Sequence, residues 1–259
     1  MTTPSALHVD RGGSGAPTLL LLHGMGGSAA LWNPLAEHLA KVWPGSWVAP
    51  DLPGHGRSGP DPAGEYTYES LAAAAAGVLD PGARVAVLGH SLGGAIGLAL
   101  AAGDFGVTVT GVVGVGIKVR WSEQELAGAQ AFAARGAQVC ATRDEAAERA
   151  VKAAGVAGLF PLEAPEVDSL VHQVRDAWRL GFDLRVLTVG APDMTGWLAT
   201  TAARGIPATL AAGEGDPMSP REHLAELVAE PVILSGLGHS AHVADPTALL
   251  PLVERLTGS

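Results

Sequence analysis

The chain has 259 residues, of which 47% are hydrophobic, and this is enough apolar material for one large α/β domain that carries an insertion. Its formal net charge of −10 argues against nucleic acid or an anionic membrane as a partner, because both need clustered Lys and Arg. The single cysteine, Cys140, excludes an internal disulfide, and no Cys/His cluster has metal-ligand spacing.

Targeting signals are not evident in the sequence. The first 15 residues contain no basic segment followed by an apolar run, and no stretch reaches the roughly 18 apolar residues of a membrane span. We therefore expect a cytoplasmic protein with a small-molecule partner, and no membrane partner, metal or cofactor. The sequence does not indicate an oligomeric state.

Short apolar runs and helix-like segments alternate along most of the chain. We predict strands at 19–22, 47–49, 85–88, 107–115, 206–212 and 231–234. We predict helices at about 28–41, 67–79, 92–102, 197–204, 219–229 and 243–256. This alternation is typical of a mostly parallel sheet covered by helices on both faces, with the site at the carboxyl ends of the strands.

The stretch Gly89-His90-Ser91-Leu92-Gly93 directly follows the apolar run 85–88 and fits the pattern G-x-S-x-G. A strand that runs into a glycine-bracketed serine and then into a helix indicates a nucleophile elbow, a strained turn that lifts the serine hydroxyl above the sheet. Side chains at the two flanking positions would clash in such a turn, so glycine is needed there. A serine hydroxyl is a poor nucleophile without a base, and the motif therefore predicts a histidine and an acid elsewhere.

Both groups follow in the last quarter of the chain. The predicted strand 206–212 leads into a turn-rich loop that holds Asp216. The predicted strand 231–234 leads into a glycine loop that holds His239. We predict that Asp216 is the acid and that His239 is the base.

Other residues compete for these two roles. Asp193 is a second acid in a turn-like setting, but the sequence before it is a less clear core strand. Glu214 stands two residues before Asp216 in the same loop. His242 is close to His239, but it falls at the start of the last predicted helix, whereas His239 fits the end of a strand better.

The strand alternation stops between Lys118 and about Val189, where the chain becomes more charged and helix-rich. We assign residues 1–119 and 190–259 to the core and residues 120–189 to a helical cap, inserted after the strand near 107–115. Within the cap we predict helices at 122–136, 142–154 and 165–180.

The third cap segment carries an apolar stripe at helical spacing, formed by Val167, Leu170, Val171, Val174 and Trp178. Such a stripe more often packs inside a protein than lines a pocket. Bulky side chains elsewhere in the insertion are expected to help line an apolar cleft over Ser91. We select Trp121, Phe160 and Trp178 as candidate substrate-binding residues.

The chain resembles the α/β-hydrolase superfamily, in its small, capped, esterase-like branch. Four landmarks carry the resemblance in family order: Leu19–Gly27, Asp51–Ser58, the elbow, and the late loops with Asp216 and His239. The order serine, aspartate, histidine is that of the family and differs from the order in chymotrypsin and subtilisin. The resemblance implies an α/β-hydrolase fold with its mostly parallel central sheet.

An oxyanion hole also follows from the resemblance. In the family, one donor is the backbone N–H of the residue after the nucleophile, which is Leu92 here, and the second comes from the loop after the third strand. By that match the second donor is Met25. These N–H groups would hold the negative charge that a tetrahedral intermediate places on the former carbonyl oxygen.

The implied activity is that of a serine hydrolase that cleaves a carboxylic ester of a small, largely apolar substrate through an acyl-enzyme. The serine weighs against epoxide hydrolases and haloalkane dehalogenases, which resemble this pattern but use Asp at that position. Alternatives with the same triad are thioester hydrolysis, lactone opening, C–C bond hydrolysis and cofactor-free haloperoxidase activity. A member of the fold that binds a ligand without turnover is a further alternative.

Overall fold

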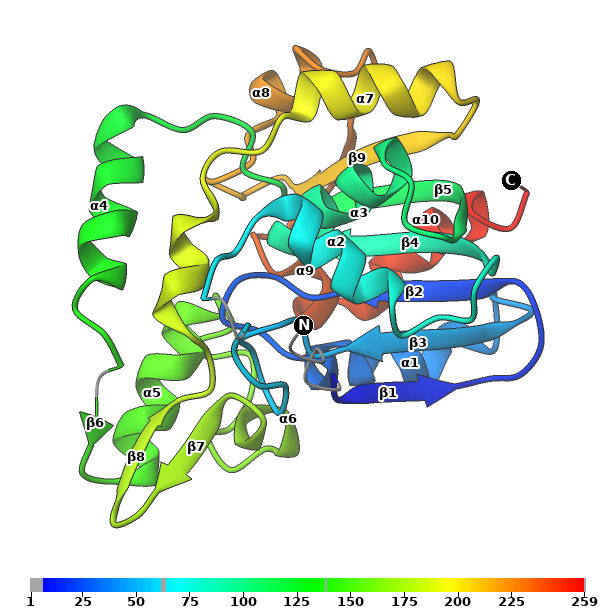
Figure 1. Cartoon of the computed structure of the whole chain (residues 1–259). Coiled ribbons are helices and arrows are strands. Elements are labelled where there is room, and N and C mark those ends of the chain that lie inside the picture. The colour runs from blue at the N-terminus through cyan, green and yellow to red at the C-terminus, as the bar shows by residue number, and fades with distance from the viewer. Residues whose placement is uncertain (1–6, 62–63, 138, 259) are drawn as a thin grey trace.

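The computed structural model describes residues 7–61, 64–137 and 139–258. Our assignments of residues 1–6, 62–63 and 259 to the core, and of residue 138 to the cap, lie outside the described residues. Within the described chain, seven strands form one sheet in the order β1-β3-β2-β4-β5-β9-β10 (Figure 1). Only β1 runs antiparallel to its neighbour, so the predicted mostly parallel sheet is confirmed.

The strands of this sheet are short and are joined by helices. Their bounds are β1 Val9–Gly12, β2 Thr18–Leu22, β3 Ser46–Pro50, β4 Arg84–His90, β5 Thr108–Val115, β9 Ala208–Gly213 and β10 Val232–Leu234. The helices around them are η1 Ala29–Trp32, α1 Asn33–Leu39, α2 Tyr68–Ala76, α3 Leu92–Ala102, α7 Met194–Ala203, α8 Arg221–Ala225, α9 Ala241–Ala244, η3 Pro246–Leu249 and α10 Leu250–Arg255, where η marks a 3₁₀ helix.

The central strands are apolar on both faces, because helices cover both sides of the sheet. In β2, Leu20 and Leu22 pack into a buried cluster with side chains of α2, α3 and α7. Leu19 and Leu21 point to the opposite face, into a cluster with side chains of α1 and α10. All four leucines are fully buried, and the strand is therefore held in register from both sides.

Two elements of the core differ from the prediction. The edge strand β1, with the sequence Val-Asp-Arg-Gly, was missed because it is half-exposed and lacks an apolar run. The predicted helix 243–256 is broken into α9, η3 and α10. The break falls at Asp245–Pro246, where Pro246 has no N–H to continue the helix and the Asp245 side chain accepts a hydrogen bond from Thr247 N–H.

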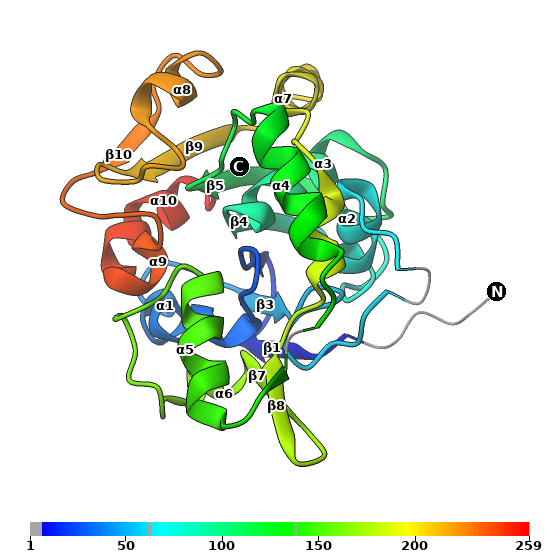
Figure 2. The ribbon, with the colours of Figure 1, turned by 90° about the vertical axis from the view of Figure 1, so that its left-hand side faces the viewer.

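The insertion lies on the side of the sheet where the parallel strands end, as Figure 1 shows, and Figure 2 looks onto that side with α4 and α5 in front. Its elements are α4 Glu123–Ala133, β6 Val139–Cys140, α5 Arg143–Ala153, α6 Pro165–Asp168, β7 Val171–Val174, β8 Ala177–Leu180 and the 3₁₀ helix η2 Leu184–Val189. Strands β6, β8 and β7 form a small antiparallel sheet. The insertion is therefore only partly helical, contrary to the prediction.

The predicted helix 165–180 is wrong beyond its first turn. Helix α6 ends at Asp168, and the chain then forms the hairpin β7–β8, which turns at Arg175 with φ +55°. Val167, Leu170 and Val171 are buried as predicted, but Val174 is 46% exposed, so no helical stripe continues past the first turn. β-Branched residues in 171–174 favour the extended form once β8 supplies the paired backbone.

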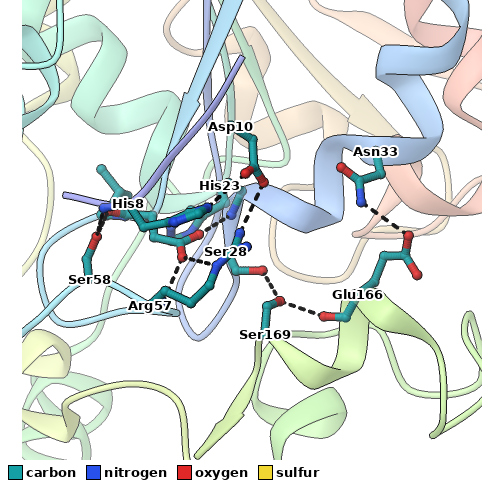
Figure 3. A network of polar contacts seen from close by, with 12 residues as sticks. His8, Asp10, His23, Ser28, Asn33, Arg57, Ser58, Glu166 and Ser169 are labelled. Atoms are coloured by element: carbon teal, nitrogen blue, oxygen red, sulfur yellow. Dashed lines mark hydrogen bonds and ion pairs between the residues drawn. The ribbon is translucent and has the colours of Figure 1, made fainter. Parts of the chain in front are cut away.

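Polar contacts join the insertion to the core beside the first loop of the sheet (Figure 3). The hydroxyls of Ser28 and Ser169 lie 2.6 Å apart, and both side chains are buried. The Asn33 amide lies within 3.4 Å of the Glu166 carboxylate. Because Ser28 and Asn33 flank η1, these contacts fix the insertion against the end of the sheet. No helix among the described residues is long and apolar enough to cross a membrane.

Candidate active site

Strand β4 ends at His90 and helix α3 begins at Leu92, so Ser91 makes the turn between them. Its backbone has φ +50° and ψ −115°, a conformation that costs a residue with a side chain on the order of 1–3 kcal/mol. The Ser91 N–H donates a hydrogen bond of 2.8 Å to the carbonyl of Val115 at the end of β5. The predicted strained turn between strand and helix is confirmed.

Glycines on both sides of the serine permit this turn. A Cβ at Gly89 would lie 2.3 Å from the carbonyl oxygen of Gly93. A Cβ at Gly93 would lie 2.1 Å from the carbonyl oxygen of Leu22. Both distances are far below van der Waals contact, and both partners are backbone atoms that no rotamer change can move, so the G-x-S-x-G spacing has a direct steric cause.

The structure brings Asp216 and His239 together from the ends of the adjacent strands β9 and β10. His239 Nδ1–H donates a hydrogen bond of 2.9 Å to Asp216 Oδ2. The other carboxylate oxygen accepts a hydrogen bond of 2.9 Å from the Met218 N–H, and the Asp216 side chain has no exposed surface. This arrangement keeps the proton on Nδ1 and leaves Nε2 as the basic nitrogen.

A second histidine connects His239 to the elbow. The His90 Nε2–H donates a hydrogen bond of 3.0 Å to the carbonyl of His239, and the two ring centroids are 4.7 Å apart. His90 directly precedes Ser91, so this contact places the histidine loop beside the serine turn. The turn after β5 packs against the same pair, because a Cβ at Gly116 would lie 3.2 Å from the Asp216 carboxylate.

The two alternative acids have other partners. Asp193 is the N-cap of α7, and its side chain accepts a hydrogen bond of 3.0 Å from the Gly196 N–H. Glu214 accepts hydrogen bonds from the Gly236 N–H and the Ser235 hydroxyl, at 2.9 and 3.0 Å. Both carboxylates therefore stabilise local backbone.

His242, the alternative base, is fully buried. Within the described residues neither of its ring nitrogens has a hydrogen-bond partner. Its ring packs 4.8 Å from that of Trp32 and 4.1 Å from that of His90. Burial, with a contribution from the nearby His239, lowers the pKa of His242 to about 3, so this side chain is a neutral packing group at ordinary pH.

Two further buried histidines lie in the first two landmark loops. The His23 Nδ1–H donates to the Gly24 carbonyl at 2.9 Å, and its Nε2 accepts from the Leu52 N–H at 2.9 Å, a pattern that only the neutral ring can satisfy. Burial lowers the pKa of His23 to about 4 and that of His55 to about 3. Their rings meet edge to face, with centroids 5.0 Å apart. Sequence reasoning did not identify this neutral cluster, because only the fold brings the histidines together.

The landmark loop 51–58 is held by one buried carboxylate. Asp51 accepts hydrogen bonds from the backbone N–H groups of Ala29 and Arg57, at 2.6 and 2.7 Å. Arg57 also reaches Asp10 on β1 at 3.1 Å, and the His8 N–H donates to Ser58, as Figure 3 shows. These contacts lock the loop to the edge of the sheet and give it a structural role.

The candidate oxyanion donors stand on either side of Ser91. Leu92 is the first residue of α3, and an N–H at that position has no partner within its own helix. The loop of Met25 lies against the elbow, because a Cβ at Gly24 would be 3.3 Å from Ser91 Cβ. Met25 and Leu92 both line the cavity that contains Ser91.

That cavity, called the Ser91 cavity below, has a volume of about 220 Å³ and a largely apolar wall. The insertion supplies Trp121, together with Leu126 and Ala129 of α4 and Ala153 of α5. The other lining residues, besides Met25, Ser91 and Leu92, are Tyr68, Ala95, Ile117, Lys118, Leu187, Val189, Gly190, Pro192 and Met218. Trp121 thus lines this cavity, and its role in substrate binding stays a prediction. The helical residues of α4 were not selected from the sequence, although Leu126 and Ala129 have the i, i+3 spacing of a shared helix face.

Phe160 and Trp178, the other two candidates for substrate binding, do not line this cavity. Both pack against the buried cluster of the insertion, which contains Cys140, Val151 and Val167. Trp178 lies on β8 opposite Cys140, because the segment is a strand and not the predicted helix. Among the described residues, no group of three or more His, Cys, Asp and Glu side chains is placed to hold a metal ion.

Solved structures share this architecture over nearly the whole chain. A thioesterase domain from the curacin biosynthetic pathway superposes with a TM-score of 0.74 at 21% identity, covering 95% of this chain and 94% of the other. An esterase from Mycobacterium tuberculosis gives a TM-score of 0.74 at 24% identity, covering 100% and 90%. At such identities these similarities establish the fold.

Sequence comparison gives a shorter match to curated proteins. Lipase LipV of Mycobacterium tuberculosis is 41% identical over 99 residues, which are 37% of this chain and 36% of the lipase. The chain thus aligns with little more than a third of this relative's length. The sequence profile of the alpha/beta hydrolase family, by contrast, matches residues 19–252, and that range contains the elbow, Asp216 and His239. The chain therefore belongs to the alpha/beta hydrolase family.

Proposed function

We propose that this protein is a serine hydrolase that cleaves carboxylic esters with small, largely apolar acyl groups. The observation that carries the proposal is the hydrogen-bonded pair of buried Asp216 and half-buried His239, beside a strained serine that opens into an apolar cavity. A structural serine has no need of a positive φ, and a structural histidine has no need of a buried carboxylate partner. Their combination at the ends of adjacent strands favours acyl transfer.

In the proposed mechanism, His239 Nε2 takes the proton of the Ser91 hydroxyl as the serine oxygen attacks the ester carbonyl. The Asp216 carboxylate holds Nδ1–H and stabilises the imidazolium, while the N–H groups of Met25 and Leu92 receive the developing oxyanion. Collapse of the intermediate expels the alcohol, which takes the proton from His239. Water then attacks the acyl-serine with the same base, releasing the acid and regenerating Ser91.

The insertion, residues 120–189, is proposed to act as a cap that selects the acyl group. Its helices α4 and α5 and its 3₁₀ helix η2 contribute apolar wall to the Ser91 cavity. Burial against such a wall favours acyl groups with a longer alkyl or an aromatic portion over an acetyl group. Each buried methylene contributes up to ~0.8 kcal/mol, or roughly a factor of four in kcat/KM.

A panel of p-nitrophenyl esters from acetyl to decanoyl tests this substrate class, with one thioester and one lactone as competitors. We expect kcat/KM to rise with acyl length until the cavity is full. A serine-directed organophosphonate should abolish turnover and leave its adduct on the peptide that contains Ser91, as seen by mass spectrometry. A flat profile across all chain lengths would rule out the apolar acyl pocket, and a faster thioester or lactone would reassign the substrate.

Two tryptophans of the insertion offer a matched pair for the pocket. Trp121→Ala should change the acyl-length preference with little change in melting temperature, because Trp121 lines the Ser91 cavity. Trp178→Ala should lower the melting temperature and leave the ratio of substrates unchanged, because Trp178 packs in the insertion's own buried cluster. The reverse outcome would indicate that the acyl group lies against Trp178 on β8 and not against Trp121.

The acid of the triad can be tested against the two alternative acids, Glu214 and Asp193. Asp216→Asn should lower kcat by about 10⁴-fold, because an amide in place of the carboxylate favours the wrong imidazole tautomer. Glu214→Gln and Asp193→Asn are isosteric controls whose hydrogen bonds serve backbone, and each should stay within tenfold of wild type. The kcat values of the three variants on one ester rank the three carboxylates. A larger loss for either control would assign the role of the triad acid to that residue.

A further inference from the structure

A second cavity of about 240 Å³ adjoins the Ser91 cavity within the insertion. The two cavities share Ala153 of α5 and lie along the same elements. Along α4, Leu126 and Ala129 line the first and Phe132 lines the second, a spacing of three residues that keeps all three on one helix face. At 1.5 Å per residue, this outer cavity extends the cleft by roughly 9 Å beyond Leu126.

The outer cavity combines an apolar wall with three cations. Phe132, Leu180 and Phe182 supply apolar surface, and Phe132 is 39% exposed. Arg149 and Lys152 stand on α5, one turn and one residue before Ala153, and Arg179 of β8 also lines the cavity. A binding site for a purely hydrocarbon chain would not need these charges.

The charges are only partly balanced by the protein itself. Arg149 pairs with Glu145 at 2.7 Å on the exposed surface of α5. Lys152 and Arg179 have no ion pair within 4 Å among the described residues. The chain as a whole carries a net charge of −10, so this local concentration of positive charge stands out against a field that repels anions.

We propose that the outer cavity binds the far end of an acyl group whose apolar body fills the Ser91 cavity and whose terminus is an anion. The acyl chain would run from the Ser91 oxygen past Ala153, along Leu126, Ala129 and Phe132, with its terminal carboxylate or phosphate at Lys152 and Arg179. This inference rests on the proposed ester hydrolysis and specifies its substrate class. The neutral alternative, a plain fatty acyl chain, would leave the two unpaired cations without a role.

Matched p-nitrophenyl esters test the anionic end. The octanoyl ester is compared with an ester of equal length that ends in a carboxylate and with one that ends in trimethylammonium. In wild type we expect kcat/KM in the order carboxylate, methyl, ammonium. Lys152→Met should lower the ratio of carboxylate-ended to methyl-ended kcat/KM by about three- to tenfold at low salt, and Arg179→Met should act in the same direction. At 0.5 M salt the difference should shrink.

Lys41→Met is the matched control, since it removes the same charge at the far end of α1, outside both cavities. It should leave the ratio unchanged and keep the methyl-ended rate within twofold of wild type. If Ser91-dependent hydrolysis is present but neither Lys152→Met nor Arg179→Met changes the ratio, the anion site is excluded and the proposed function stands.

Binding decides the case in which no ester is hydrolysed. Calorimetry then measures octanedioic acid monomethyl ester against the wild type, Lys152→Met and Lys41→Met. Binding that weakens three- to tenfold in Lys152→Met alone supports the anion site without turnover. Equal binding by all three proteins, or none, overturns it.

Discussion

Replacing Ser91 or His239 with alanine is expected to lower the turnover of any ester substrate by on the order of 10⁴- to 10⁶-fold. Without Ser91 no acyl-enzyme forms, and without His239 the serine hydroxyl keeps its proton. Because the two groups act as one unit, the double variant should be no slower than the worse single variant. Steady-state kinetics on one well-hydrolysed ester measures all three.

Ser235→Ala is a suitable control, since Ser235 lies in the same loop as His239 and, within the part of the chain that the structure describes, its hydroxyl bonds only to Glu214. It should keep at least a tenth of wild-type activity. Ser91→Gly adds stability as a second readout. This variant should be as inactive as Ser91→Ala but more stable than Ser91→Ala, because glycine adopts the positive φ at this position without strain. If Ser91→Ala keeps more than a tenth of the activity on every substrate, acyl-serine chemistry is wrong.

Local patterns were sufficient to predict the elbow and the contact between Asp216 and His239. Each lies at the carboxyl end of an apolar strand, and parallel strands bring those ends to one edge of the sheet. The residues are 23 positions apart, but β9 and β10 are neighbours, so their loops meet. The catalytic roles of the three residues remain predictions that the alanine and asparagine variants test.

The insertion was predicted less well, because its short apolar segments fit two periodicities. Val167, Leu170 and Val171 have helical spacing, and the first turn is indeed helical, but the pairing of β7 with β8 is a tertiary event that no local pattern encodes. The predicted helix 165–180 placed Trp178 on the apolar stripe of the cap, and Trp178 was selected as a substrate-binding residue. In the structure the strand directs it into the cluster of α5 instead.

The histidine cluster behind the site leads to the second large effect, on stability. His23, His55, His90 and His242 are buried, and burial lowers the pKa of each: to about 4 for His23, about 3 for His55 and His242, and well below the ordinary value for His90. For His55, His90 and His242, neighbouring histidines lower the pKa further, since a second positive charge in the cluster would be repelled. The folded protein therefore resists protonation of this cluster.

The sign of the pH dependence follows from the unfolded chain, where histidine has a pKa near 6.5. Below that pH the unfolded chain binds protons that the folded protein does not. The free energy of unfolding is therefore highest above pH 6.5, as far as these histidines determine it, and it decreases as the pH drops toward 4. At pH 5 the loss is roughly 2 kcal/mol for each of His23, His55 and His242, or about 6 kcal/mol together. Typical domains have a total stability of about 5–15 kcal/mol.

We therefore expect the free energy of unfolding to fall by about 6 kcal/mol between pH 7.5 and 5, which urea titrations from pH 7.5 to 4.5 will measure. The surface charge predicts the opposite trend, because a net charge of −10 becomes smaller as the pH falls and the repulsion between surface charges weakens.

His242→Leu distinguishes the effect of the buried histidines from that of the surface charge. The ring nitrogens of His242 have no partner among the described residues, so leucine removes a proton-binding site without breaking a hydrogen bond. This variant should lose about 2 kcal/mol less than wild type between pH 7.5 and 5, and the difference should persist at 0.5 M salt, which screens surface charges but affects buried ones little. A free energy of unfolding that stays constant or rises between pH 7.5 and 5 would mean that the buried histidines do not control acid stability.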